Sequence, residues 1–111
     1  MQGFQLTFFT QQDRSHGGKP VAEWIIEEAR KLGIRGATMI AAIEGFGRHG
    51  RMHSSHFFEL ADQPLEVTMA VSAEEADRLF ARISEERLKV FYIKAPIEFG
   101  FIGEDEAAPE R

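Results

Sequence analysis

Four stretches of the chain carry the hydrophobic patterns of β-strands. Apolar and polar residues alternate over residues 4–10 and 65–71, which is the period-two pattern of a strand with one buried face. Residues 37–43 hold apolar side chains at odd and even positions alike, as expected of a strand that is covered on both faces or lies against a neighbouring subunit. Residues 90–93 form a fourth apolar run, which Pro96 is predicted to end.

Two stretches between these strands have the 3.6-residue period of amphipathic helices. In the first, Pro20 is predicted to lie in the first turn, and Gly33 is predicted to end the helix in the left-handed conformation. In the second, Ser72 and Glu75 form a capping box that starts the helix. The apolar residues predicted to be buried are Val21, Ile25, Ala29 and Leu32 in the first helix and Ala76, Leu79, Phe80 and Ile83 in the second.

The order of these elements is β-α-β-β-α-β, which predicts the fold class. With right-handed crossovers, this order gives a ferredoxin-like α+β domain, an antiparallel four-stranded sheet with both helices on one face. We expect residues 1–103 to form this single domain and the acidic residues 104–111 to be a disordered tail. Residues 45–56 then form a long loop between the second and third strands.

The composition narrows the classes of function. The chain has 111 residues, no cysteine and a formal net charge of −5. Without cysteine, neither a disulfide framework nor a thiolate metal site can form, and the acidic balance argues against a nucleic-acid partner. No apolar run approaches the length of a membrane span, and residues 1–10 lack the features of a secretory signal, so we expect a cytoplasmic protein.

Glycines and arginines are interleaved directly after the second predicted strand. Gly45, Gly47 and Gly50 alternate with Arg48 and Arg51. Glycine allows the backbone to approach a ligand closely, and the planar guanidinium group matches phosphate oxygens. This combination predicts an anion-binding loop, and a flexible connection with solvated arginines is the alternative.

Two motifs resemble those of a known family. Residues 33–38 (GIRGAT) and 44–48 (EGFGR) are similar to the G-I-x-G-x-T and G-F-G-R elements of PII signalling proteins, whose ferredoxin-like sheet carries a long regulatory loop. A closer resemblance is to the PII-like family called domain of unknown function 190 (DUF190), and it is carried by residues 4–12, 33–50, 56–60 and 90–93.

The resemblance implies a homotrimer that binds an adenine nucleotide in clefts between subunits. We expect a regulatory protein and not an enzyme. The nucleotide state would be passed through the long loop to a partner such as a membrane transporter or channel. By their positions in the motifs, Thr38 would lie near the nucleoside, and Lys89 would contact phosphate ahead of the fourth strand. The loop residues implied at the phosphates are Gly45, Phe46, Gly47 and Arg48, with Gly50 and Arg51 as further contacts.

The sequence also departs from the PII pattern in two places. Residues 84–88 (SEERL) replace the glycine-rich phosphate loop of PII proteins, and Glu98 and Gly100 stand in the region of a downstream arginine pair. Fewer cationic donors compensate the charge of a triphosphate less well. We therefore expect an adenine mono- or diphosphate, or a different anion, as the effector ligand, with no cofactor required.

Histidines in and near the loop offer a metal ion as an alternative ligand, although we expect no metal site. His49, His53 and His56, with His16 elsewhere, are candidate ligands of zinc, copper or nickel, although no helix fixes a ligand pair. Solvent-exposed loop histidines are the alternative. No spacing of acids, serines and histidines is diagnostic of a catalytic site.

Two further functions are compatible with the predicted fold. RNA-binding modules share this element order, and Phe58 and Phe91 could stack on bases, but the acidic balance argues against RNA, and no stretch resembles the aromatic strand motif of these modules. The other alternative is a trimer that binds no ligand and whose subunit contacts are made by Trp24, Phe99 and Phe101.

Overall fold

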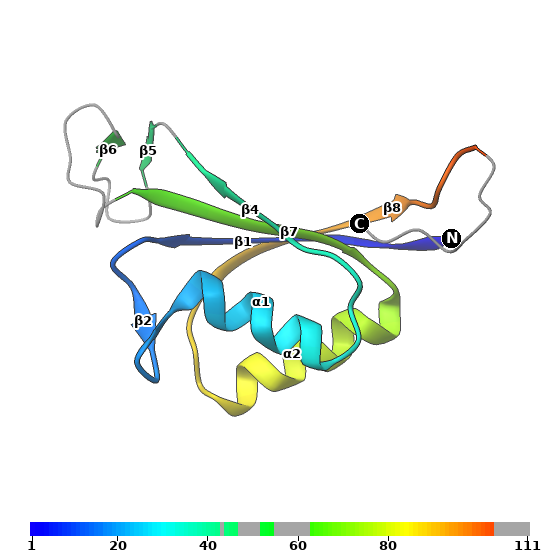
Figure 1. Ribbon diagram of the computed structural model, residues 1–111, viewed down its shortest axis with the longest axis horizontal. Coiled ribbons are helices and arrows are strands. Elements are labelled where there is room, and N and C mark those ends of the chain that lie inside the picture. Colours follow the sequence, from blue (N-terminus) through cyan, green and yellow to red (C-terminus); the bar gives the residue numbers. More distant parts are fainter. Residues whose placement is uncertain (43, 47–51, 55–62, 104–111) are drawn as a thin grey trace.

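The computed structural model describes residues 1–42, 44–46, 52–54 and 63–103, and in these ranges two helices cover one side of a four-stranded sheet (Figure 1). Neither of these helices has the length and the apolar run needed to cross a bilayer. In chain order the elements are β1 (Gln2–Gln11), β2 (Ser15–His16), β3 (Lys19–Pro20), α1 (Val21–Lys31), β4 (Thr38–Ala41), β5 (Glu44–Phe46), β6 (Met52–Ser54), β7 (Pro64–Val71), α2 (Ala73–Glu85) and β8 (Phe91–Glu98).

The sheet has the topology predicted for a ferredoxin-like fold. Its strands lie in the order β4-β7-β1-β8, and each neighbouring pair is antiparallel. The central strands β1 and β7 pair from Phe4 opposite Val71 to Gln11 opposite Pro64. Figure 1 shows α1 and α2 beneath the same face of the sheet. The predicted fold class is therefore confirmed, and we call the face away from the helices the outer face.

The hydrophobic core lies between the sheet and the helices. Successive residues of a strand face opposite sides of the sheet, and in β7 every second residue from Leu65 to Val71 is buried. The apolar rows of α1 and α2 pack against these residues, as predicted. The largest completely buried side chains are Phe8, Leu6, Ile25, Leu79, Val21, Val67 and Val71.

The helix ends follow local signals with one small difference. The Ser72 hydroxyl accepts from the Glu75 amide over 3.1 Å, and the Glu75 carboxylate accepts from the Ser72 amide over 2.9 Å, which confirms the capping box. Gly33 ends α1 with a φ of 86°, as predicted. Pro20 precedes the first helical turn instead of lying in it, because it is extended and pairs with Ser15 in the β2–β3 ribbon.

β4 corrects the prediction of a strand covered on both faces within the chain. All four of its residues are exposed, with Met39 at 44% and Ile40 at 46%. The physical reason is that β4 is the edge strand next to β7, while the helices cover the central strands. The alternative of a neighbouring subunit produces the same apolar pattern and stays a prediction.

β8 corrects the prediction that Pro96 ends the last strand. The strand continues to Glu98, and Pro96 lies opposite Phe4 of β1. Proline is tolerated here because β8 is an edge strand, in which only every second residue must donate an N–H to the neighbouring strand.

Residues 11–19 are mostly polar and carry no hydrophobic period, which predicts a loop, and here the structure differs. The segment contains the two-residue strands β2 and β3, joined by Gly17 and Gly18. Both glycines have positive φ, at 58° and 83°, which is the backbone of a type I′ hairpin turn. Strands of two residues are too short to show a hydrophobic period, so the pattern of the sequence did not reveal them.

Gly3 is required where β1 passes closely under the end of β7. A Cβ atom at this position would overlap the Val71 carbonyl oxygen and lie 2.7 Å from a ring carbon of Phe99. We expect Gly3→Ala to lower the free energy of unfolding in urea by about 2 kcal/mol, because backbone atoms would have to move. Gly100→Ala is the control, since its Cβ would meet no atom within 4 Å; equal stability of the two variants would contradict the prediction.

Candidate functional site

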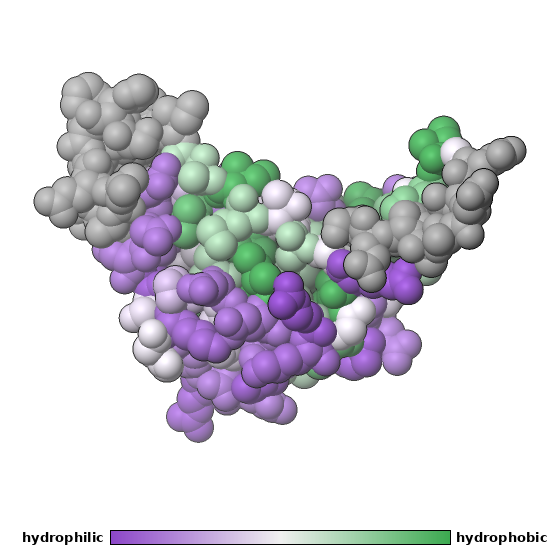
Figure 2. Space-filling view, in the orientation of Figure 1, coloured by the Kyte–Doolittle hydropathy of each residue, from purple (hydrophilic) through white to green (hydrophobic). Residues whose placement is uncertain are grey.

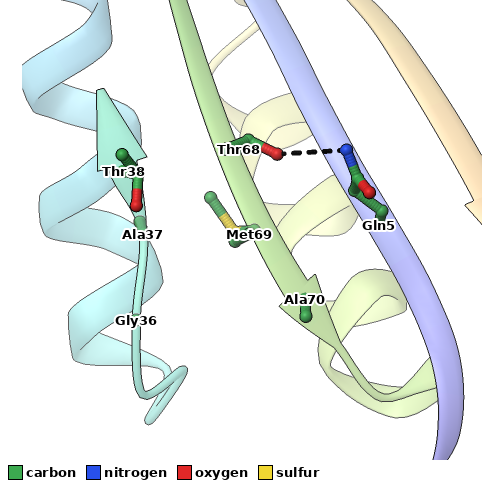
Figure 3. A pocket seen from close by; sticks show the side chains of 7 residues that line it. All are labelled: Gln5, Gly36, Ala37, Thr38, Thr68, Met69 and Ala70. Atoms are coloured by element: carbon green, nitrogen blue, oxygen red, sulfur yellow. Dashed lines mark hydrogen bonds between the residues drawn. The ribbon is translucent and has the colours of Figure 1, made fainter. Parts of the chain in front are cut away.

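A hollow of about 350 Å³ opens between the start of β4 and the end of β7 (Figure 3). This volume is within the range of small-molecule sites in proteins. We call it the β4 pocket. Its lining comes from β1, β4, β7 and the segment before β4, and consists of Gln5, Gly36, Ala37, Thr38, Thr68, Met69 and Ala70.

The β4 pocket forms because the ladder between β4 and β7 stops early. Thr38 opposite Thr68 is the last pair of this ladder. Gly36 and Ala37, which lead from α1 into β4, lie outside the ladder and border the opening. The sequence thus builds the pocket by bringing the chain back from α1 to the sheet a few residues before pairing begins.

The β4 pocket is polar and uncharged. The Gln5 side-chain amide donates to the Thr68 hydroxyl over 3.4 Å, and the Thr7 hydroxyl is 3.4 Å from the same oxygen. Thr38 adds a hydroxyl, and alanine and methionine side chains supply apolar walls. Among the described residues that line the pocket, none is titratable. Such a lining suits a flat neutral group with hydrogen-bonding edges, such as a nucleobase, better than a phosphate.

The residues predicted at the phosphates are only partly described. Gly45 and Phe46 belong to β5, which pairs with β6 so that Gly45 is opposite His53 and Phe46 is opposite Met52. The expectation of an open loop from Gly45 onward is therefore wrong at these two positions, because a short ladder already pairs the two backbone segments. The other candidates lie outside the described residues: Gly47, Arg48, His49, Gly50, Arg51 and His56.

Lys89 and Thr38 lie at opposite edges of the sheet. Lys89 is exposed in the link between α2 and β8, and β8 begins with Phe91 opposite Phe9. Thr38 belongs to β4, and the strands β7 and β1 stand between the two edges. The edge strands are three strand spacings, or about 14 Å, apart. A single chain therefore does not bring these two predicted site residues together.

A buried acid that sequence reasoning missed links the two helices. Glu28 is 5% exposed, and its carboxylate accepts from the Lys31 ammonium over 2.9 Å and from Nε of Arg82 over 2.8 Å. The hydrogen bond from Lys31 and then the one from Arg82 hold the Glu28 pKa below its ordinary value, against the opposing effect of burial. The signal in the sequence was its spacing of four from Trp24, which places Glu28 on the buried face of α1.

Arg82 extends this cluster toward the β2–β3 ribbon. Its Nη1 donates to Glu86 over 2.8 Å, and its guanidinium lies 5.5 Å from the Trp24 ring centre. Glu86 also contacts His16, whose Nε2 is 3.0 Å from the carboxylate. Arg82 and then His16 hold the Glu86 pKa below its ordinary value. Trp24 is thus a core residue, 7% exposed, and the cluster fastens α1, α2 and the ribbon together.

The histidines do not form a metal site in the described part of the chain. Within those ranges, no three His, Asp or Glu side chains are grouped as ligands. His16 is engaged with Glu86 and packs edge-on against Trp24 at 5.1 Å, and His53 lies in β6.

The outer face of the sheet is uncovered and partly apolar. The register places Phe9, Phe91, Ile93 and Ile40 on it, and the Phe9 and Phe91 rings are 5.6 Å apart. Phe91 is 69% exposed and Ile93 is 49% exposed. Figure 2 shows hydrophobic residues gathered around β4, whereas the helices below are largely hydrophilic. Exposed apolar residues gathered on one face are typical of an interaction site.

Comparisons of the sequence with known proteins identify the family. Residues 3–94 match the model of the DUF190 family, which is described as an uncharacterized ACR family. A relative, the UPF0166 protein of Aquifex aeolicus (strain VF5), is 32% identical over 75 residues, which cover 68% of this chain and 71% of that protein.

Two solved structures share the fold. The nitrogen regulatory PII-like protein CPII of Thiomonas intermedia K12, bound to ADP, AMP and bicarbonate, matches with a TM-score of 0.67 and 19% identity over 91% of each chain. A PII-like signaling protein of Thermus thermophilus matches with a TM-score of 0.64 and 20% identity, over 86% of this chain and 87% of that one. The resemblance to the DUF190 family is thereby confirmed, and the chain belongs to that family.

Proposed function

We propose that this protein is a PII-like regulatory protein that binds an adenine mono- or diphosphate at clefts between the subunits of a homotrimer. The observation that carries the proposal is the uncharged β4 pocket at Thr38, where the resemblance to PII proteins puts the nucleoside. Its volume and its mixture of amide, hydroxyl and apolar groups suit a nucleobase. Structures of CPII with ADP and AMP support this class of ligand for the fold.

The phosphates of such a ligand need cations, which the β4 pocket lacks among its described lining. In this proposal the loop that starts at Gly45 and Phe46 supplies a cation from Arg48 and a backbone N–H donor from Gly47. Gly50 and Arg51 are further contacts of the same two kinds. Lys89 supplies a second cation from a neighbouring subunit. The placement of Thr38 and Lys89 at opposite edges of one sheet supports a shared site, because the β8 edge of one copy can lie beside the β4 edge of the next.

The outer face supports the homotrimer. It carries exposed Phe91, Ile93 and Ile40, which are costly to leave in water and would be buried if three sheets packed together. Such packing would also cover Thr38 as well as Ile40 in β4, which both face outward and are exposed in the single chain.

Regulation follows from the position of the loop. Residues 43–62 connect the end of β4 to the start of β7, whereas the β4 pocket lies at the start of β4 and the end of β7. A nucleotide with its base in the pocket would therefore extend along β4 to reach the loop with its phosphates. Phosphates held at the base of this loop would favour one loop conformation, and a partner such as a membrane transporter or channel would bind one conformation more tightly than the other. No chemical step is involved.

The proposal predicts that filling the β4 pocket weakens nucleotide binding. Ala70→Leu adds a branched side chain to the pocket lining, and we expect the dissociation constant for ADP to rise about tenfold or more. The measurement is isothermal titration calorimetry with ADP, AMP, ATP, GDP and bicarbonate, and the matched control is Ala70→Ser, which keeps the pocket open. Unchanged ADP affinity in Ala70→Leu would remove the pocket from the site.

Titration of the wild-type protein also distinguishes a nucleotide-binding regulator from a metal-binding protein and from a trimer without a ligand. Binding of ADP or AMP but not GDP supports an adenine-specific regulator. A protein that binds no nucleotide but is stabilised by zinc or nickel would support the histidine ligands, and a protein with no response to any of these would support a trimer that acts through contacts alone.

A further inference from the structure

The link between α2 and β8 holds a strained backbone without a glycine to relieve it. Arg87 has a φ of 55°, and among the residues other than glycine that the structure describes it alone has a positive φ. The left-handed region costs a residue with a Cβ atom about 1 kcal/mol or more. This conformation ends α2, since the Arg87 and Leu88 amides donate back to Ser84 and Ile83 over 3.0 and 3.3 Å. It also sets the direction in which the chain reaches Lys89.

The β2–β3 ribbon, together with Arg14 directly before it, holds this link through two side chains. Nη2 of Arg14 donates to the Lys89 carbonyl oxygen over 2.9 Å, and Nε2 of His16 lies 3.0 Å from the Glu86 carboxylate. In Figure 1 the ribbon stands beside the chain that leads from α2 to β8. The two contacts are placed on either side of Arg87, so they fix both ends of the strained segment.

Arg14 is itself attached to the folded body. Its amide donates to the Gln11 carbonyl over 3.1 Å at the end of β1, and its carbonyl accepts from the Val21 amide over 2.9 Å at the start of α1. A guanidinium donor makes a stronger hydrogen bond to a carbonyl than a neutral donor does. The Lys89 backbone is therefore tied to the junction of β1 and α1 and not only to its own neighbours in sequence.

We propose that Arg14 is a positioning residue for Lys89: its bond to the Lys89 carbonyl holds the exposed ammonium group where it meets the ligand's phosphates. This inference rests on the proposed function, because it takes Lys89 as a phosphate contact. The ribbon then takes the role that a glycine-rich loop would otherwise have, since it stabilises one backbone conformation of a segment, residues 84–90, that has no glycine. Arg14 acts through Lys89 and needs no contact with the nucleotide.

The test measures how the affinity of the protein for adenine ligands depends on the number of phosphate groups that the ligand carries. Arg14→Met and Lys89→Met are compared with Arg78→Met, a control arginine exposed on α2, by calorimetry with ADP, AMP and adenosine. We expect Arg14→Met to weaken the binding of ADP about tenfold and to leave the binding of adenosine unchanged, and we expect the same of Lys89→Met. The double variant should bind ADP no more weakly than Lys89→Met does, because both changes remove the same interaction with phosphate. A urea unfolding midpoint close to that of the wild type shows that the fold is kept.

Other outcomes overturn the inference and remain distinguishable. If Lys89→Met weakens ADP while Arg14→Met does not, Arg14 is not a positioning residue and the proposed function stands. Equal weakening of ADP and adenosine in Arg14→Met would mean that Arg14 only supports the fold. If Lys89→Met leaves ADP affinity unchanged, Lys89 does not contact the phosphates and the inference is wrong. A wild-type protein that binds no nucleotide overturns the proposed function together with the inference.

Discussion

Replacing Arg82 by leucine is expected to lower the melting temperature by about 10 °C, because the buried Glu28 carboxylate loses one of its two hydrogen-bonding cations. The Glu28 side chain is only 7% exposed, so water cannot replace the lost donor. The change also removes the bond to Glu86 and the guanidinium from the face of Trp24. The measurement is a thermal melt followed by circular dichroism.

Two further variants decide whether the effect belongs to the buried acid. Arg78→Leu removes an exposed arginine from the same helix and should shift the melting temperature by no more than about 2 °C. The double variant Glu28→Leu, Arg82→Leu should recover much of the loss, since it leaves no unpaired charge at the buried position of Glu28. A double variant as unstable as Arg82→Leu would show that packing on Trp24, and not the ion pair, is the cause.

The pH dependence of these melts gives an independent check. The Glu28 pKa is lowered in the folded protein, first by Lys31 and then by Arg82. A carboxyl group whose pKa is lower in the folded state stabilises the fold above its unfolded pKa, here 4.5, and this contribution is lost as the pH falls through the folded pKa. Below pH 4.5, the melting temperature of the wild type should therefore fall toward that of Arg82→Leu, and a constant difference between them would contradict this assignment.

The sequence predicts those elements whose stabilising interactions join residues close together in the chain. The alternation in β7 and the reciprocal capping of Ser72 and Glu75 depend on residues within a few positions of each other, so the sequence predicts them correctly. Glu28 was missed because a charged side chain counts as polar in a hydrophobic pattern, and only its partner on α2 makes its burial acceptable. Arg82 is 54 positions away from Glu28, and no periodicity connects them.

The candidate site was predictable in part, for a related reason. The motif in residues 33–38 pointed to Thr38, which does line the β4 pocket. Gln5 and Thr68 were not predicted, because polar residues that alternate with core residues look like an ordinary solvent face. The pocket depends on where the ladder between β4 and β7 stops, and this is a property of pairing between distant strands.

The outer face offers the other large expected effect. Ile93→Asp is expected to convert the proposed trimer into single chains of 12.6 kDa, because it puts a carboxylate in the apolar surface that three packed sheets would bury. Ile93 suits this test because it is 49% exposed and lies opposite Thr7, on the far side of the sheet from the helices. Its replacement therefore leaves the core between the sheet and the helices intact. Light scattering coupled to size-exclusion chromatography measures the mass.

Nucleotide binding should be lost in the same variant, since the proposed site takes Thr38 from one copy and Lys89 from the next. The control is Ala73→Asp, which adds the same charge at the start of α2, where the helix dipole favours an acid. This variant should keep both the mass and the ADP affinity of the wild type. If Ile93→Asp stays trimeric, the outer face is not the interface. If it is monomeric but binds ADP as before, one chain alone holds the site, and Lys89 then has no part in it, because the sheet separates it from the β4 pocket.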